Sequence, residues 1–388
     1  MRNLTDIFSE AELEAMRRPL EEAVPPPAQY YTSKDLYELE VENIFLKEWL
    51  WVGHTEQLKQ PGDYFSFNIV DEPIIVLLDQ SNHLRAFSAV CRHRGAVVTA
   101  GEGNCRSFSC PYHGWTYSLT GQLIGAPQMR EVKGFDPAKY GLIPLKVETW
   151  EGSILVNFDP NSKPLSSTLG ELPAYVKNFK MGELVPTERR IYKFECNWKM
   201  LVENFAEAYH VTATHGNTPG YSDLRYWSVA KPRGSYEILI GEFDEPMVTN
   251  VPSSSGKPAY VLENLTEAEK RRQQYVVLLP NWGWSLQADG MICFVMVPDG
   301  PDRSHFIMDW HFPKAVMESP DFPEISRASY DAVDGFNDQD IRVLGNTYLG
   351  YKSRLFHPGR FSLHEPIPHR LVRYVLDRTD RKRTDAAN

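Results

Sequence analysis

The chain has 388 residues, of which 42% are hydrophobic, so it is long enough for two globular domains with a sizeable core. Its formal net charge of −10 argues against nucleic acid or an anionic membrane surface as its partner. No apolar run reaches the length of a membrane span, and the first residues lack the apolar stretch of a signal peptide, so we expect a cytoplasmic protein.

The N-terminal part of the chain is expected to be helical. Residues 8–24 read as an amphipathic helix with Ser9 as its cap, and a second helix is expected over residues 33–49. From residue 52 to about residue 160 the pattern changes to short strands separated by turns. This stretch is typical of a small all-β domain.

The second half of the chain mixes strand and helix patterns. A helix is expected over 197–211, a long helix over 323–355, and a surface loop over 253–258. The expected strands are 190–196, 236–243, 275–279, 291–297 and 304–312. An antiparallel sheet with helices against one face is the economical arrangement of these elements.

Two mixed pairs of cysteine and histidine lie inside the strand-rich stretch. Cys91 and His93 form a C-x-H pair, and Cys110 and His113 form a C-x2-H pair. A Rieske [2Fe–2S] cluster has two thiolates on one iron and two imidazoles on the other, so two loops that each offer one of each kind suit it. Structural zinc is the alternative, but zinc sites usually pair like ligands with like. The spacing therefore favours the cluster. The remaining three cysteines show no pairing pattern and are expected to be free thiols.

A second metal site is indicated by two histidines near the end of the 197–211 helix. Glu207 and His210 are three residues apart and share a helical face, and His215 follows five residues later, so we expect the helix to end or loosen between the histidines. Two histidines and one carboxylate form the facial triad of mononuclear non-haem iron. Two unrelated histidines are the plain alternative, but electrons from a cluster need a destination. The carboxylate is expected from the long late helix, where Asp338 and Asp340 are both candidates.

Over residues 35–375 the chain resembles the catalytic α subunit of Rieske non-haem iron oxygenases, in particular the shorter monooxygenases and demethylases that assemble from α subunits alone. The resemblance is carried by Cys-Arg-His-Arg-Gly, by Cys-Pro-Tyr-His-Gly-Trp, by the segment from Asn197 to His215, and by the late Asp-containing helix followed by Pro-Gly-Arg. It implies an α+β fold, with an all-β Rieske domain at 46–160 and a helix-grip catalytic domain at 161–388. An N-terminal helical segment, residues 1–45, would pack on the catalytic domain.

The resemblance also implies roles for individual residues. Asp340 is favoured over Asp338 as the third iron ligand. The family forms head-to-tail homotrimers, in which Glu207 would link the cluster ligand His113 of one subunit to the iron ligand His210 of the next. Further family positions near the iron and behind it match Asn204 and Tyr209.

The chain lacks both a dinucleotide-binding glycine fingerprint and a plant-type ferredoxin motif. NAD(P)H oxidation is therefore expected on a separate reductase, which would deliver electrons directly or through a ferredoxin. We expect a terminal oxygenase that uses O2 to hydroxylate a small organic substrate, leading to oxidative N- or O-dealkylation. Hydroxylation or dihydroxylation of an aromatic ring is the alternative reaction. A pure electron carrier without the iron triad and a zinc-stapled binding module are the alternatives from other functional classes.

Candidate pocket residues are aromatic side chains near the predicted iron in sequence or in strand pattern. They are Phe205, Trp282, Trp284 and Phe336. The segment from residue 216 to residue 280 is a candidate substrate lid.

Overall fold

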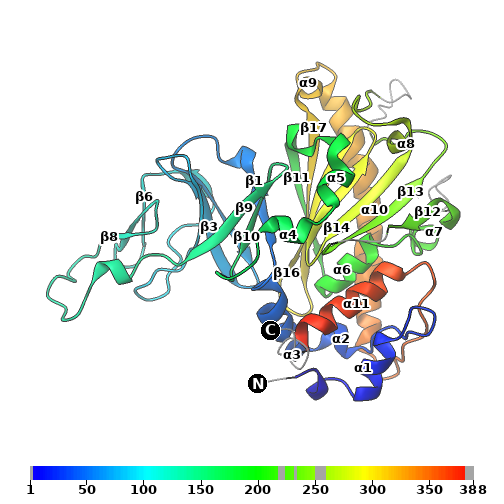
Figure 1. Cartoon of the computed structure of the whole chain (residues 1–388), viewed down its shortest axis with the longest axis horizontal. Coiled ribbons are helices and arrows are strands. Elements are labelled where there is room, and N and C mark those ends of the chain that lie inside the picture. Colours follow the sequence, from blue (N-terminus) through cyan, green and yellow to red (C-terminus); the bar gives the residue numbers. More distant parts are fainter. Residues whose placement is uncertain (1–2, 217–222, 231–233, 250–258, 381–388) are drawn as a thin grey trace. The chain divides into compact units, whose positions relative to one another are not determined.

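The computed structural model describes residues 3–216, 223–230, 234–249 and 259–380. The loop expected at 253–258 lies outside these residues. The chain divides into two compact units, a small unit Leu46–Lys163 and a large unit that joins Met1–Phe45 to Pro164–Asn388 (Figure 1). In the described residues, no helix is both long and apolar enough to span a bilayer.

The small unit is built from antiparallel strands in two sheets. The larger sheet has the strand order β1-β10-β9-β4-β3-β2-β5, and the smaller has the order β6-β7-β8. The strands are β1 (Leu50–His54), β2 (Asp63–Ile69), β3 (Glu72–Leu78), β4 (Leu84–Ser88), β5 (Glu102–Asn104), β6 (Ser107–Ser109), β7 (Thr116–Ser118), β8 (Leu123–Gly125), β9 (Pro144–Trp150) and β10 (Ser153–Asn157). Two short 3-10 helices, η3 (Thr55–Gln57) and η4 (Pro137–Lys139), complete the unit.

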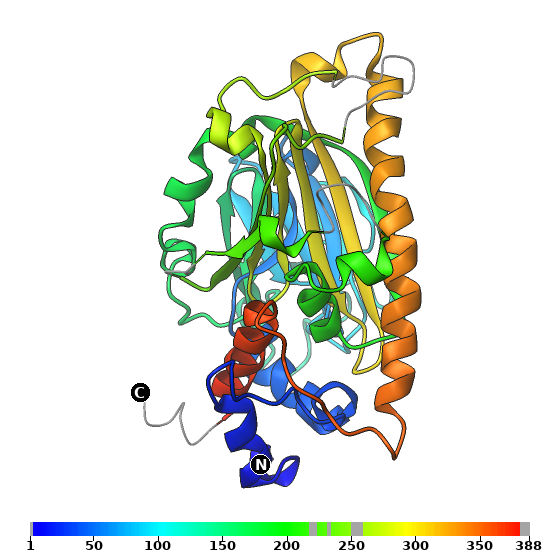
Figure 2. The same cartoon turned by 90° about the vertical axis from the view of Figure 1, so that its right-hand side faces the viewer.

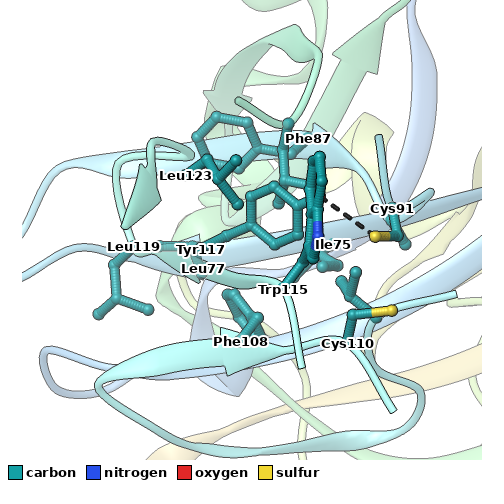
Figure 3. Close-up of a cluster of buried hydrophobic side chains, with 13 residues drawn as sticks. Ile75, Leu77, Phe87, Cys91, Phe108, Cys110, Trp115, Tyr117, Leu119 and Leu123 are labelled. Atoms are coloured by element: carbon teal, nitrogen blue, oxygen red, sulfur yellow. Dashed lines mark hydrogen bonds between the residues drawn. The ribbon is translucent and has the colours of Figure 1, made fainter. Parts of the chain in front are cut away.

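A hydrophobic core holds the loops of the small unit in place. Side chains of β3, β4, β6 and β7 meet in it, and Cys91 and Cys110 lie at its margin with their sulfur atoms on the same side of Trp115 (Figure 3). Both cysteines are buried, with 3% and 4% of their surface exposed. The apolar core thus supports the two loops that carry the candidate cluster ligands.

The large unit holds a seven-stranded antiparallel sheet with the strand order β11-β17-β16-β15-β14-β13-β12. Its strands are β11 (Leu184–Phe194), β12 (Trp227–Val229), β13 (Tyr236–Glu242), β14 (Arg272–Leu278), β15 (Trp282–Gln287), β16 (Gly290–Pro298) and β17 (Ser304–Pro313). The 30-residue helix α10 (Phe322–Tyr351) runs along the sheet (Figure 2). The expected α+β fold with a long helix on an antiparallel sheet is confirmed.

The remaining helices of the large unit are short. They are α1 (Glu10–Arg17), α2 (Gln29–Thr32), α3 (Lys34–Glu40), α4 (Leu165–Leu169), α5 (Leu172–Val176), α6 (Trp198–Phe205), α7 (Val211–Thr214), α8 (Glu267–Lys270), α9 (Lys314–Met317) and α11 (Pro366–Thr379), with 3-10 helices η1 (Leu4–Asp6), η5 (Lys177–Phe179), η6 (Met181–Glu183) and η7 (Leu224–Tyr226). The helix expected over 33–49 is α3 followed by one π-helical turn, η2 (Val41–Phe45). The expected cap at Ser9 is present, but α1 ends at Arg17, well before residue 24.

Candidate active site

The two loops that carry the candidate cluster ligands have the same backbone design. The carbonyl oxygen of Cys91 accepts a hydrogen bond from the Gly95 N–H, and that of Cys110 accepts one from the Gly114 N–H, both at 3.0 Å. Each glycine has a positive φ, 78° and 70°, which ordinary side chains disfavour. The glycine four residues after each cysteine therefore turns each loop back on itself.

The histidine side chains of the two loops lie next to each other. The rings of His93 and His113 are 4.7 Å apart between centroids, and Trp115 stacks on His93, also at 4.7 Å. Desolvation, with the charges of His93 and Arg94, lowers the pKa of His113, which favours the neutral imidazole that a metal requires.

Tyr117 is a candidate functional residue that the sequence did not reveal. Its hydroxyl oxygen lies 3.2 Å from Cys91 Sγ and accepts a hydrogen bond from the Arg92 N–H at 3.0 Å, so the hydroxyl would donate to the sulfur when Cys91 is a thiolate ligand. Burial and this contact raise the pKa of Tyr117, which keeps the phenol protonated. Hydrogen bonds to ligand sulfur tune the potential of an iron–sulfur cluster.

The four loop ligands do not converge on a single point. Among the described residues, only His210, His215 and Asp340 form a group of three or more potential ligands whose donor atoms all lie within 4.8 Å of one another. A tetrahedral zinc site would bring its four donors together, whereas a two-iron cluster holds its two ligand pairs apart. The loops fit the cluster better than a single ion.

The second site is built around a break between α6 and α7. Helix α6 ends at Phe205, His210 is the residue before α7, and His215 is the residue after it. The single turn of α7 therefore separates the two histidines. The helix was expected to end or loosen between the two histidines. This position is wrong, because α6 already ends at Phe205, before His210.

The imidazoles of both histidines face Asp340 on α10. His215 Nε2 lies 3.4 Å and His210 Nε2 lies 3.8 Å from Asp340 Oδ1. This oxygen is buried and has no hydrogen-bond partner among the described residues. Burial raises the pKa of Asp340, against the charges of His210 and His215. A cation between the three side chains would satisfy the buried oxygen, so the donor set fits a mononuclear iron.

The Nδ1 atom of each imidazole is already in a hydrogen bond within the chain. His210 Nδ1 lies 2.5 Å from Glu207 Oε1, and His215 Nδ1 lies 2.7 Å from Gln339 Oε1. Because both oxygens accept hydrogen bonds, each Nδ1 carries a proton and each Nε2 is left for the metal. Burial lowers the pKa of His210, but the hydrogen bond and the charge of Glu207 raise it by a larger amount. The pKa of His210 therefore lies above its ordinary value. Gln339 is a second residue that the sequence did not reveal.

Not all of the other predicted site residues lie at the candidate iron site. Asp340 is buried, whereas Asp338 points to solvent on the same helix. Asn204 lies at the site, and its amide nitrogen is buried without a partner in the described part of the chain. Tyr209 is not brought into the site, because its side chain is 51% exposed and stacks on His364.

A cavity of about 250 Å³ extends from these ligands between the sheet and α10. Phe205 and Phe336 line it, as expected, and the ring of Phe336 lies 4.9 Å from that of His215. Of its described lining side chains, the only carboxylates are Glu207 and Asp340 at the iron end, and no lysine or arginine is present. The candidate lid segment supplies part of the wall through β12, β13 and β14.

The expectation that Trp282 and Trp284 line the pocket is wrong. Both lie on β15 with 1% of their surface exposed, and neither contacts the cavity. Ser285 and Gln287 of the same strand line it instead. Successive residues of a strand point to opposite faces of the sheet, so one face of β15 holds the tryptophans in the core and the other holds the cavity wall.

Comparison with known families decides the identity of this architecture. Residues 48–136 match the Rieske [2Fe-2S] domain, and residues 181–381, more than half of the chain, match the ring hydroxylating alpha subunit catalytic domain. The chain belongs to the Rieske ring-hydroxylating α-subunit family.

Relatives of this family include enzymes named for small amines. Choline monooxygenase of Beta vulgaris is 29% identical over 349 residues, covering 88% of this chain and 74% of that protein. The carnitine monooxygenase oxygenase subunit of Acinetobacter baumannii is 30% identical over 286 residues, covering 66% of this chain and 76% of that protein. The crystal structure of the quaternary ammonium Rieske monooxygenase CntA with γ-butyrobetaine shares the fold, with a TM-score of 0.76, 23% identity, and coverage of 92% and 96% of the two chains.

The family assignment fixes the class of activity. The protein is a Rieske-type non-haem iron oxygenase whose cofactors are a [2Fe–2S] cluster and a mononuclear iron, and it receives its electrons from a reductase. The zinc-stapled module and the pure electron carrier are therefore both excluded.

Proposed function

We propose that this oxygenase hydroxylates the carbon next to the nitrogen of a small amine, or next to an ether oxygen, and so causes oxidative N- or O-dealkylation. One oxygen atom of O2 enters the C–H bond, and the other leaves as water after uptake of two electrons and two protons. The resulting carbinol breaks its C–N or C–O bond to give an aldehyde and the dealkylated product.

The charge distribution of the cavity supports an amine or an ether as the substrate. The described cavity wall is apolar or neutral except at the iron end, where a bound Fe(II) would offset the charges of Glu207 and Asp340. Such a cavity suits a neutral or cationic substrate better than an anion, because an anion would be buried without a partner. The relatives named for choline, carnitine and quaternary ammonium compounds support an amine as the substrate class.

The roles of the surrounding residues follow from their contacts. His210, His215 and Asp340 would hold the iron, which when bound supplies the site for dioxygen activation. Glu207 and Gln339 fix the ligand imidazoles in the tautomer that binds through Nε2. The buried amide nitrogen of Asn204 lies at the same end of the cavity. The apolar wall excludes water from the reacting carbon.

We further propose a head-to-tail homotrimer in which Glu207 joins His210 to the cluster histidine His113 of a neighbouring subunit. Within one chain Glu207 already contacts His210 Nδ1 through one carboxylate oxygen. The other oxygen accepts hydrogen bonds from the backbone N–H groups of Tyr209 and His210, which hold the carboxylate in place. The solved structure of a quaternary ammonium Rieske monooxygenase gave insight into inter-subunit electron transfer in that enzyme, which supports the same arrangement here.

Product analysis tests the proposed reaction. The purified holoenzyme, supplied with a reductase pair and NADH, is offered choline, γ-butyrobetaine, simple N-methylamines, aryl methyl ethers and naphthalene. Formaldehyde released in step with NADH oxidation is the expected result. A diol that carries both atoms of 18O2, with no aldehyde from any amine or ether, would contradict dealkylation and favour ring dihydroxylation.

A further inference from the structure

The end of the cavity remote from the candidate iron ligands is polar. Gln273, Ser285 and Gln287 line it, and each has 5% or less of its surface exposed. Burial of an amide costs free energy unless the amide is hydrogen bonded. Each of the two glutamines has one protein partner, so the amide groups that these partners leave free are candidates to hydrogen-bond a ligand in this largely apolar cavity.

The sheet register places these side chains together. Gln274 of β14 pairs with Leu286 of β15, and the strands are antiparallel, so Gln273, which precedes Gln274, lies opposite Gln287, which follows Leu286, and both line the cavity. Gln273 Nε2 donates to Ser285 Oγ at 2.5 Å. The three side chains form one continuous polar surface.

The orientation of the Gln287 amide follows from its partner. Thr249 Oγ1 lies 3.1 Å from Asp289 Oδ2, and the same carboxylate oxygen accepts the Thr249 N–H at 2.7 Å. A carboxylate only accepts, so the threonine hydroxyl donates to it and must accept from Gln287 Nε2, at 3.1 Å. In the described structure this is the only side-chain hydrogen bond of Gln287, which leaves its carbonyl oxygen and second N–H for a ligand.

The polar wall lies well away from the iron end. Thr249 Oγ1 is 3.1 Å from Ser329 Oγ on α10, and Ser329 precedes Asp340 on that helix by eleven residues. At a rise of 1.5 Å per residue, these two positions are about 16 Å apart. After allowance for the side chains at both ends, a bound molecule would span on the order of 10 Å.

We propose that the polar wall, defined as Thr249, Gln273, Ser285 and Gln287, binds an uncharged hydrogen-bonding group of the substrate, such as a hydroxyl, carbonyl or amide. This group lies at the opposite end of the substrate from the carbon that is oxidised. The assignment rests on the proposed dealkylation for the identity of the reacting end. The described lining residues of the polar wall carry no formal charge, and the buried carboxylate of Asp289 behind Thr249 disfavours an anion, so an uncharged hydrogen-bonding group fits the wall.

Calorimetric binding to the holoenzyme tests the polar wall with a matched pair of probes. Hydroxyhexyltrimethylammonium and heptyltrimethylammonium differ by a terminal hydroxyl in place of a methyl group. The substitutions Gln287→Met and, separately, Gln273→Met keep the side-chain volume and remove the amide. Each is expected to lower the ratio of hydroxyl-probe to alkyl-probe affinity by roughly tenfold, as expected for loss of a buried hydrogen bond.

Gln274→Met is the matched control. Gln274 is a buried glutamine on the same strand, but it points away from the cavity, so its substitution is expected to leave the affinity ratio unchanged. An unchanged ratio in both Gln287→Met and Gln273→Met, or an equal shift in Gln274→Met, would overturn the proposal. Tighter binding of a carboxypentyl probe than of the hydroxyl probe would also overturn it.

A separate formaldehyde assay with the same probes distinguishes the two proposals. Formaldehyde from both probes with no change of affinity ratio in the variants means that the polar wall is wrong and dealkylation stands. An affinity ratio that depends on Gln287, with no formaldehyde from either probe, means that the wall is right and dealkylation is wrong.

Discussion

The two histidines of the candidate iron site are held by different partners. His210 Nδ1 faces the carboxylate of Glu207, whereas His215 Nδ1 faces the neutral amide of Gln339. Both partners fix the ring orientation, but only the carboxylate adds a charge that strengthens the histidine as a ligand. The two imidazoles therefore differ in the charge of the partner that holds them, although both present Nε2 to the metal.

Substitution of Gln339 tests the contribution of its hydrogen bond. Gln339→Leu is expected to weaken binding of Fe(II) or Co(II) to the mononuclear site by about 10–100-fold, because His215 loses the partner that orients its ring. Titration of metal-depleted protein measures this. Asp338→Asn, an exposed change one residue away, is the control, and equal affinities in both variants would show that Gln339 has no positioning role.

The choice between the two aspartates of α10 can be tested by iron content. Asp340→Ala is expected to lower the iron from about three to about two atoms per chain, with the reduced cluster signal in electron paramagnetic resonance retained. Asp338→Ala is expected to keep all of the iron, because this side chain points to solvent. Loss of the single iron from the Asp338 variant alone would reverse the assignment.

For individual residues, sequence spacing was enough to predict metal ligands that lie close together in one motif. The mixed Cys–His pairs and the pair His210 and His215 were found from sequence, and the family resemblance chose Asp340. Tyr117 and Gln339 were not found, because a phenol directed at a sulfur or an amide directed at an imidazole leaves no periodic signal. Their roles depend on loop and helix placement that only tertiary structure gives.

Helix α6 is anchored by buried ionisable groups. Lys199 Nζ lies 2.6 Å from Glu40 Oε1 of α3, and Trp198 Nε1 donates to the same carboxylate at 2.9 Å. One turn later, both carboxylate oxygens of Glu203 accept from the Tyr31 hydroxyl, at 2.9 and 3.1 Å. These contacts fix the helix that leads into the iron site.

Glu203 makes the stability of this element depend on pH. Burial raises the pKa of Glu203 to about 8, against the hydrogen bond from Tyr31 and the charge of Lys199. The folded chain therefore keeps a proton that the unfolded chain releases near its ordinary pKa of 4.5. The contribution of Glu203 to the free energy of unfolding therefore falls as pH rises from about 4.5 to about 8.

Glu203→Gln is expected to flatten this decline, since the amide does not titrate. Urea unfolding of the metal-loaded protein at several pH values within this window measures the slope. Glu195→Gln, an exposed change just before α6, should keep the parental slope. A parental slope in the Glu203 variant would mean that this carboxyl is ionised in the folded protein.

At the element scale, long periodic segments were predicted well and short ones were not. The pattern over 323–355 corresponds to α10 within a few residues, because its apolar positions follow a helical period. The position of the break between α6 and α7 was predicted wrongly, and so was the face of β15 that lines the cavity. An alternating strand does not reveal which face is core when both faces are buried, as they are around Trp284 and Ser285.

Mixed assemblies test the proposed trimer at the scale of the whole molecule. A Cys110→Ser chain should lack the cluster, and an Asp340→Ala chain should lack the mononuclear iron, so each alone is expected to be inactive. If the cluster of one subunit serves the iron of the next, a random mixture should regain about one quarter of the parental activity, because one neighbouring pair in four combines an intact cluster with an intact iron site. Co-expression with two affinity tags provides the mixture. No recovery in mixed assemblies would place electron transfer within one chain.

We propose that electrons stored on the Rieske cluster are used at the site of His210, His215 and Asp340 to insert oxygen into the substrate. A single turnover tests it most directly: fully reduced holoenzyme, free of reductase, is mixed with O2 and an N-methylamine, and the cluster signal and formaldehyde are followed together. The cluster signal is expected to disappear as formaldehyde forms, and Asp340→Ala is expected to show neither change on the same timescale. Formaldehyde formed while the cluster stays reduced, or parental cluster oxidation in the Asp340 variant, would contradict it.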